Sequence, residues 1–367
     1  MTDETCWESA AAALGGRRAL HDLSASEREM LLRWALRNRL AGLLWRVAGC
    51  VPGAVEGRDA WLDAACRQAA YSVYQEQELR RVVDEFVRAG IPPIFLKGAA
   101  LAYTLYPDAA LRPGADHDML IRPEEAVRVR AIFERQGYEP ELQPPGEHIA
   151  SQFGFRRTDA RAMVYLFDIH WKISNALVYA DRLSYEETRA EAVSMPRLDA
   201  RALAPSPVHS LVIACVHRIA HHADTDDLLW LYDIHLLAGS LTGAEWERAL
   251  RLAEAKQLCA VVLCGIERAG RAVGQSAPDA VIERLRGLAS REPPAPLLGQ
   301  RTRMIDVALT DFRTLPTSRA RLQLLAEHLM PPVSYMRRAY PRCPAPLLPF
   351  AYVYRVARGA PRWFRPR

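Results

Sequence analysis

The chain has 367 residues, of which half are apolar and a quarter are charged, so it can bury a sizeable core. Its net charge of +5 is too small for this length to indicate nucleic-acid binding by itself. No stretch approaches 18 continuous apolar residues, and the acidic start MTDETCWESA does not resemble a signal peptide. The seven cysteines form no C-x-x-C pair. We therefore expect free thiols in a cytoplasmic protein without a membrane span.

An N-terminal helical region is expected over residues 1–90. Its last segment, residues 67–90, repeats apolar side chains at helical spacing, among them Leu79, Val82 and Phe86. Gly90 follows as a natural helix end.

Residues 91–200 are expected to form a small α/β core. IPPIFL reads as a buried strand, AALAYTLY as a short helix, DHDMLI as a second strand, and residues 122–137 as a helix with Pro123 in its first turn. AMVYLFDIHWKI reads as a third strand, with IASQFGFRR as a hairpin partner. This alternation predicts an α/β (α+β) fold with a small mixed sheet, flanked by helical regions on both sides.

A C-terminal helical domain is expected over residues 201–367. Ser206 and Pro207 have the pattern of a helix cap followed by a first-turn proline. The last segment, PAPLLPFAYVYRVARGAPRWFRPR, is proline-rich, aromatic and basic. We favour a final helix packed on the core with a solvated basic end; an interfacial or partner-binding segment is the alternative.

Two carboxylates open the second expected strand. Asp116 and Asp118 are two residues apart, so on a strand they point to the same face, roughly 7 Å apart. Such a pair repels unless a cation lies between its members, and Mg²⁺ suits carboxylate oxygens. The pair therefore predicts a metal site.

A third carboxylate, Asp168, comes late in the third expected strand. Neighbouring strands lie about 4.8 Å apart, so Asp168 can complete a three-carboxylate cluster if its strand lies beside the second one. Such a cluster suits two-metal chemistry on a triphosphate. The alternative for Asp168 is a strand-end residue that caps a turn.

The turn before the short helix is a candidate phosphate site. Gly98 lets the backbone approach a ligand, and the helix start offers unpaired N–H groups. Lys97 and Lys172 are two of only three lysines among 48 cationic residues, and lysine is a compact charge suited to phosphate. Arg112 is placed to reach a phosphate oxygen. The alternative is an ordinary turn with surface cations.

A histidine-rich helix follows the core. His217 and His221 are four residues apart and share a helix face, where they can bind a metal, line a substrate or play a structural part. Asp233 lies on an apolar helix and is costly to bury alone, so we expect it to pair with an arginine or with one of these histidines.

Together these segments resemble the nucleotidyltransferase superfamily, with its polymerase-β-like fold. They are most similar to an uncharacterised bacterial branch found in biosynthetic gene clusters. The resemblance is carried by FLKGAALAYTLYPDAALRPGADHDMLI, by FDIHWKI and by HRIAHH with DDLLWLYDIHLL, over residues 90–240. Two positions depart from the superfamily pattern: Ala99 follows Gly98 where Ser or Gly is usual, and His117 stands where an apolar residue is usual.

The resemblance implies which residues act. Asp116, Asp118 and Asp168 would hold Mg²⁺ or Mn²⁺ and perform catalysis, with Asp168 as a possible base. Lys97 and Gly98 would bind phosphate. From the residues themselves we also expect Arg112 and Lys172 in the nucleotide site, and an acceptor side that includes His170, His217, His221 and Asp233.

The expected reaction transfers a nucleoside monophosphate from an NTP such as ATP to an unknown acceptor, as a tailoring step in biosynthesis. The acceptor would be a peptide or a small metabolite rather than nucleic acid. Three alternatives remain. One is transfer of a sugar or phosphosugar from a nucleotide-sugar to a phosphorylated peptide, and another is a degenerate transferase that only binds a partner. The third, an RNA-modifying transferase, would require a basic groove lined by aromatic residues, which the arginine-rich tail permits but does not demand.

Overall fold

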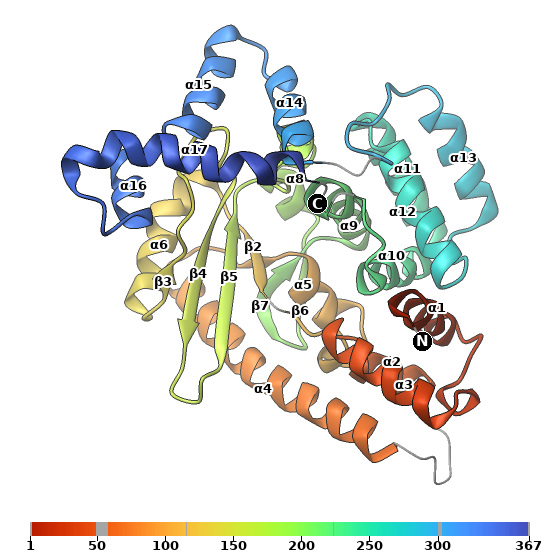
Figure 1. The fold of residues 1–367 in the computed structure, drawn as a ribbon. Helices are drawn as coiled ribbons and strands as arrows, with labels where there is room; N and C mark the ends of the chain where they lie inside the picture. Colours follow the sequence, from red (N-terminus) through yellow and green to blue (C-terminus); the bar gives the residue numbers. More distant parts are fainter. Residues whose placement is uncertain (1, 49–57, 115, 223, 300–302, 366–367) are drawn as a thin grey trace. The chain divides into compact units, whose positions relative to one another are not determined.

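The computed structural model describes residues 2–48, 58–114, 116–222, 224–299 and 303–365. It confirms the expected mixed α/β fold (Figure 1). The strand order in the sheet is β3-β4-β5-β2-β1-β7-β6. The strands are β1 (Ile94–Phe95), β2 (His117–Leu120), β3 (Glu139–Pro140), β4 (Gln152–Thr158), β5 (Val164–His170), β6 (Val193–Met195) and β7 (Asp199–Ala204). β1 and β7 are parallel, whereas the β3–β4, β4–β5 and β6–β7 pairs are antiparallel, so the sheet is mixed as expected.

The packing divides the chain into two compact units, each built from segments that are far apart in the sequence. Unit 1 comprises Met1–His117, Glu191–Cys215 and Asp226–Pro293, and unit 2 comprises Asp118–Ala190, Val216–Thr225 and Pro294–Arg367. The consecutive domains expected at 1–90, 91–200 and 201–367 stay a prediction.

Unit 1 is mainly helical, and its described part confirms the helices expected before residue 90. Its helices are α1 (Asp3–Leu14), α2 (Ala25–Arg37), α3 (Ala41–Ala48), α4 (Arg58–Arg88), α5 (Lys97–Thr104), α10 (Leu228–Ser240), α11 (Gly243–Ala255), α12 (Cys259–Ala272) and α13 (Asp279–Ala289), with the 3₁₀ turns η1 (Leu20–Asp22) and η2 (Ala109–Leu111). α9 (Pro207–His222) begins in this unit. Ser206 caps α9 as predicted, since its Oγ accepts from the N–H of His209 at 3.3 Å.

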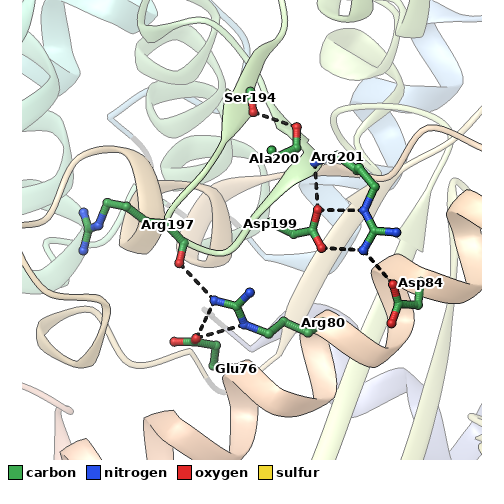
Figure 2. Close-up of polar contacts among 8 residues, drawn as sticks. All are labelled: Glu76, Arg80, Asp84, Ser194, Arg197, Asp199, Ala200 and Arg201. Carbon is green, nitrogen blue, oxygen red and sulfur yellow. Dashed lines mark hydrogen bonds and ion pairs between the residues drawn. The ribbon is translucent and has the colours of Figure 1, made fainter.

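The β6–β7 hairpin of unit 1 is held to α4 by polar contacts (Figure 2). Arg201 Nη2 lies 2.6 Å from Asp84 Oδ1 of α4 and 2.6 Å from Asp199 Oδ2 of its own strand. Arg80 of α4 donates to the carbonyl of Arg197 in the turn between the strands at 3.3 Å. These contacts between distant segments fix the hairpin that supplies β7 to the sheet.

Unit 2 contains β3, β4, β5 and most of β2, together with the remaining helices. These are η3 (Pro123–Glu125), α6 (Ala126–Arg135), α7 (Leu177–Ala180), α8 (Tyr185–Ala190), α14 (Met304–Thr314), α15 (Ser318–Leu329), α16 (Val333–Ala339), η4 (Ala345–Leu347) and α17 (Leu348–Phe364). β4 and β5 form the hairpin expected from the sequence, with Gly154 opposite Asp168 and Gln152 opposite His170 (Figure 1).

One face of the β4–β5 hairpin packs on α6. The ring of Phe133 on α6 stacks on Phe155 of β4, with centroids 4.8 Å apart, and lies 5.1 Å from the ring of Phe167 of β5. Because side chains alternate along a strand, Gln152, Asp168 and His170 are directed to the opposite face. The aromatic core thus determines which face of the hairpin carries polar groups.

Candidate metal centre

Three side chains of unit 2 converge on the polar face of the hairpin. Asp118 from β2 joins Asp168 and His170 from β5, and their potential ligand atoms all lie within 4.8 Å of one another. The backbone fixes this arrangement, since the N–H of Ile121, just after β2, donates to the carbonyl of His170 at 2.9 Å. Asp168 and His170 are two residues apart on one strand and therefore share a face.

Asp118 and His170 form a buried hydrogen-bonded pair. Nε2 of His170 lies 2.7 Å from Oδ1 of Asp118, and the two residues are only 1 % and 7 % exposed. A carboxylate accepts only, so the imidazole donates in this contact. Burial out of water strengthens such a charge-assisted bond and holds the Asp118 carboxylate in one orientation.

Asp168 is held by a chain of amides. Its Oδ2 accepts from Gln152 Nε2 at 3.2 Å, and Gln152 Oε1 accepts from Asn175 Nδ2 at 2.8 Å. The backbone N–H of Asn175 donates to Nε2 of His221 at 3.3 Å. His217 stacks on His221 with centroids 4.9 Å apart. The histidine pair expected from the sequence is therefore linked to Asp168 within unit 2.

Gly154 keeps the space beside Asp168 open. A Cβ atom at this position would lie 3.1 Å from Asp168 Oδ1 and 2.6 Å from Oε2 of Glu141. A side chain at residue 154 would therefore displace one or both carboxylates. Glu141 is exposed and adds a further acid to this region.

The donor set fits a divalent cation. Two carboxylates are the ligands that Mg²⁺ uses most in proteins, and an imidazole beside them is well suited to Mn²⁺. The Nε2 atom of His170 either donates to Asp118, as here, or loses its proton and becomes a ligand itself. Asp116 is exposed at the bend before β2. It is not a member of this group among the described residues, and its role as a metal ligand stays a prediction.

The candidate phosphate turn of unit 1 has an unusual backbone. Lys97 is the first residue of α5 and has φ = +48°, a left-handed conformation that lysine seldom adopts. The missing side chain of Gly98 leaves room for Arg112, whose Nη1 would lie 3.3 Å from a Cβ atom there. A strained residue at a predicted ligand turn is a feature of functional sites.

Arg112 is occupied by Asp233 rather than exposed to a ligand. Its Nε and Nη2 donate to the two carboxylate oxygens of Asp233 at 2.9 and 2.7 Å, and Nη1 donates to the Pro113 carbonyl at 3.3 Å. Tyr106 Oη also donates to Asp233, at 2.8 Å. Burial alone would lower the pKa of Arg112, but the Asp233 carboxylate outweighs it and raises that pKa. The expected arginine partner of Asp233 is thus confirmed. The contact of Arg112 with a phosphate stays a prediction.

Two further residues from the sequence analysis, His117 and Lys172, have polar partners within their own units. His117, on the first residue of β2, is buried and its Nε2 lies 2.8 Å from Gln75 Oε1 in unit 1. Lys172 follows β5, and its Nζ lies 3.3 Å from Asp181 Oδ2. Because Asp181 is exposed, an ion pair of this kind contributes little to stability.

Sequence reasoning missed the parts of the site that support Asp168. The hairpin register places Gln152 opposite His170, and the same-face rule that joined Asp116 to Asp118 also joins Asp168 to His170. That rule would have moved His170 from the expected acceptor side to the metal group. The contact of Gln152 with Asn175 depends on side-chain directions, for which the sequence carries no signal.

The structure has an open mixed sheet flanked by helices, and two acids and a histidine converge from adjacent strands. This arrangement is consistent with a nucleotidyltransferase-like α+β core. Residues 24–270 match a family described as uncharacterised nucleotidyltransferases, and the chain belongs to this family. The matched region contains all three residues of the candidate metal centre. We found no curated protein that matches the chain. In the part of the chain that the structure describes, no helix is long and apolar enough to cross a membrane.

Proposed function

We propose that this protein is a metal-dependent nucleotidyltransferase that moves a nucleoside monophosphate from an NTP to a hydroxyl, amine or phosphate of an acceptor. The convergence of Asp118, Asp168 and His170 carries the proposal, because two carboxylates from adjacent strands supply the oxygen ligands that Mg²⁺ or Mn²⁺ requires. Membership of the nucleotidyltransferase family supports the same reaction class.

Each residue of the centre has a distinct role in this proposal. Asp118 and Asp168 hold the cation, and Asp116 contributes a further oxygen from the bend before β2. A bound divalent cation neutralises charge on the phosphate oxygens and orients the triphosphate. His170 keeps the Asp118 carboxylate in place through its 2.7 Å contact. The amide chain through Gln152 does the same for Asp168.

The proposed chemistry forms one bond and breaks another at the α-phosphorus. The acceptor atom attacks this phosphorus, and the bond to the β-phosphate oxygen breaks, so that pyrophosphate leaves. A hydroxyl or amine acceptor also loses a proton. Asp168 is half-buried and is our candidate to take it, whereas Asp118 is enclosed by its bond to His170. Lys97, with Gly98 at the start of α5, is proposed to bind the triphosphate, with Lys172 as a second cation.

The acceptor side is proposed to include His217 and His221. The link from Asp168 through Gln152 and Asn175 to His221 places this pair at the end of a continuous hydrogen-bonded chain. We propose a peptide or small metabolite as the acceptor that this stacked pair of imidazoles contacts. We propose that the reaction takes place in the cytoplasm, as a tailoring step in biosynthesis.

Calorimetric titration of the purified protein with each NTP and with a nucleotide-sugar, with and without Mg²⁺, tests the proposal. We expect metal-dependent binding of an NTP, lost in both Asp116→Ala and Asp118→Ala while the circular dichroism spectrum is unchanged. Metal-dependent binding of the nucleotide-sugar alone would favour transfer of a sugar or phosphosugar. If the folded protein binds neither, it is a degenerate transferase that acts as a partner protein, and the proposal is wrong.

A further inference from the structure

Helix α17 is fixed to unit 2 by one of its faces. Leu348 and Ala351 are buried in a cluster with Met336 of α16. Further along the helix, the Trp363 ring lies edge-on to His328 of α15, with centroids 5.2 Å apart. α17 is therefore a defined part of unit 2, and its other faces are held in place.

A second face of α17 is apolar and exposed. Phe350 and Val353 are each 69 % exposed, Phe364 is 60 % exposed and Tyr354 is 52 % exposed. At 100° per residue these four positions fall within one sector of the helix. An exposed apolar face on a packed helix commonly marks an interaction site.

Arginines lie along one edge of the apolar sector, between it and the packed face. Arg358 and Arg362 are exposed and lie next to the apolar sector on the helical wheel, and Arg365 is exposed just after the helix ends. Residues 331–367 contain eight arginines and no acidic residue. Because the whole chain has a net charge of +5, the rest of it has a net charge of −3. The basic character of the protein is thus concentrated in the segment that also exposes apolar side chains.

The surroundings of α17 extend this surface. Twelve of the eighteen large apolar side chains exposed in the described residues lie between Leu309 and Phe364. A cavity of about 550 Å³ between α15, α16 and α17 is lined by aromatic residues such as Tyr335 and Trp363 and by Arg355, Arg358 and Arg362. The cavity therefore offers a ligand both apolar contacts and positively charged side chains.

We propose that α17 docks this protein on an anionic phospholipid surface. Its apolar face would lie at the level of the acyl chains, while its arginines would contact the phosphates, as in helices that lie along a membrane rather than across it. A second copy of the chain is a poorer occupant, because a two-fold contact would bring like-charged stripes together. A nucleic acid would neutralise the arginines but leave the apolar face in water. The proposal is independent of the nucleotidyl-transfer reaction.

Co-sedimentation of the full chain with lipid vesicles tests this proposal. Vesicles of phosphatidylcholine with 30 % phosphatidylglycerol would be compared with phosphatidylcholine alone, at low and high salt. Phe350→Glu and Val353→Glu place a charge on the apolar face, and Arg358→Gln with Arg362→Gln removes two cations. Val127→Glu is the matched control, because Val127 lies on α6 of the same unit and is 80 % exposed.

We expect binding to the anionic vesicles only. It should weaken about thirtyfold in the double arginine variant, from two lost lipid-facing charges, and be lost in either glutamate variant. The Val127→Glu protein should bind like the parent. Absence of binding by the folded parent protein would overturn the proposal, as would equal loss in Val127→Glu. Binding of the chain to a DNA or RNA duplex with no binding to vesicles would assign the surface to nucleic acid instead.

Discussion

His170 Nε2 lies 2.7 Å from Asp118 Oδ1, in a pair that is almost completely buried. The bond joins β2 to β5 at the point where Asp168 also converges. A buried carboxylate is costly unless it is hydrogen-bonded. The His170 imidazole therefore stabilises the buried Asp118 carboxylate, and in the proposed metal centre it would also keep that carboxylate oriented toward the cation.

We predict that His170→Leu lowers the free energy of unfolding of the metal-free protein by about 1–3 kcal/mol, because the buried Asp118 carboxylate loses its donor. His170→Gln retains a donor and should restore most of that stability. Urea unfolding curves measure both. In addition, Mn²⁺ affinity should fall about 10–100-fold in the leucine variant and less in the glutamine variant. A leucine variant as stable as the parent would contradict the structural role.

Gly154→Ala should damage metal binding more than stability. The added Cβ would lie 3.1 Å from Asp168 Oδ1 and 2.6 Å from Glu141 Oε2, so the carboxylates must move. The control is Gly287→Ala on α13, where a Cβ meets nothing within 4 Å and alanine should stabilise the helix by about 0.5–1 kcal/mol. Calorimetry with Mn²⁺ should show weaker binding only for the residue 154 variant. Equal Mn²⁺ affinity in both variants would show that Asp168 does not hold the metal.

Arg112 and Asp233 form a fully buried ion pair whose partners are 121 residues apart. Removing one partner leaves an uncompensated charge, so Arg112→Met and Asp233→Leu should each cost about 3–5 kcal/mol in unfolding free energy. The double variant should be more stable than either single one. A double-mutant cycle from chemical denaturation gives the coupling energy. Additive losses of unfolding free energy would contradict the pairing. An Arg112→Met protein that is as stable as the parent but binds NTP more weakly would support the nucleotide-binding role expected from the sequence.

Asp311 of α14 should make unit 2 less stable as the pH rises. Burial raises the pKa of Asp311 to about 6, against the opposing effect of the N–H that Leu177 donates at 2.7 Å. The folded state therefore keeps a proton that the unfolded chain releases, and unfolding free energy falls between about pH 4 and pH 6. Asp311→Asn removes this slope and should be more stable than the parent above pH 6, by up to about 3 kcal/mol.

The control for this measurement is on the same helix. Hydrogen bonds from Arg303 lower the pKa of Asp306. The ionised Asp306 therefore adds to the free energy of unfolding above its unfolded-state pKa, and this stabilisation is lost as the pH falls. Asp306→Asn should therefore be less stable than the parent at neutral pH. Thermal unfolding from pH 4 to pH 8 would distinguish the two variants, and a parallel profile for parent and Asp311→Asn would refute the assignment.

The elements with strong local patterns could be predicted from the sequence. The α4 helix and the β4–β5 hairpin follow from apolar periodicity. The sequence placed Asp168 beside Asp118 only on the condition that their strands are neighbours, and the structure meets that condition. β6 and β7 were not expected, because residues 193–204 are short, interrupted by Pro196 and polar. Their position depends on contacts such as Arg201 with Asp84, which are distant in the sequence. The Arg112–Asp233 pair was hidden for the same reason: the pairing was anticipated for Asp233, but nothing local to Arg112 indicated it.

Electron paramagnetic resonance titration with Mn²⁺ tests the central claim most directly. The proteins compared are the parent, Asp118→Asn, Asp168→Asn and, as the control, Asp63→Asn on α4. Asp63 is more than half exposed and forms a surface pair with Arg67. We predict that the parent and the Asp63 variant bind Mn²⁺ equally, and that each of the other two loses at least tenfold in affinity while remaining folded. Equal Mn²⁺ binding by the folded parent and Asp118→Asn would show that the cluster of Asp118, Asp168 and His170 is not the metal centre.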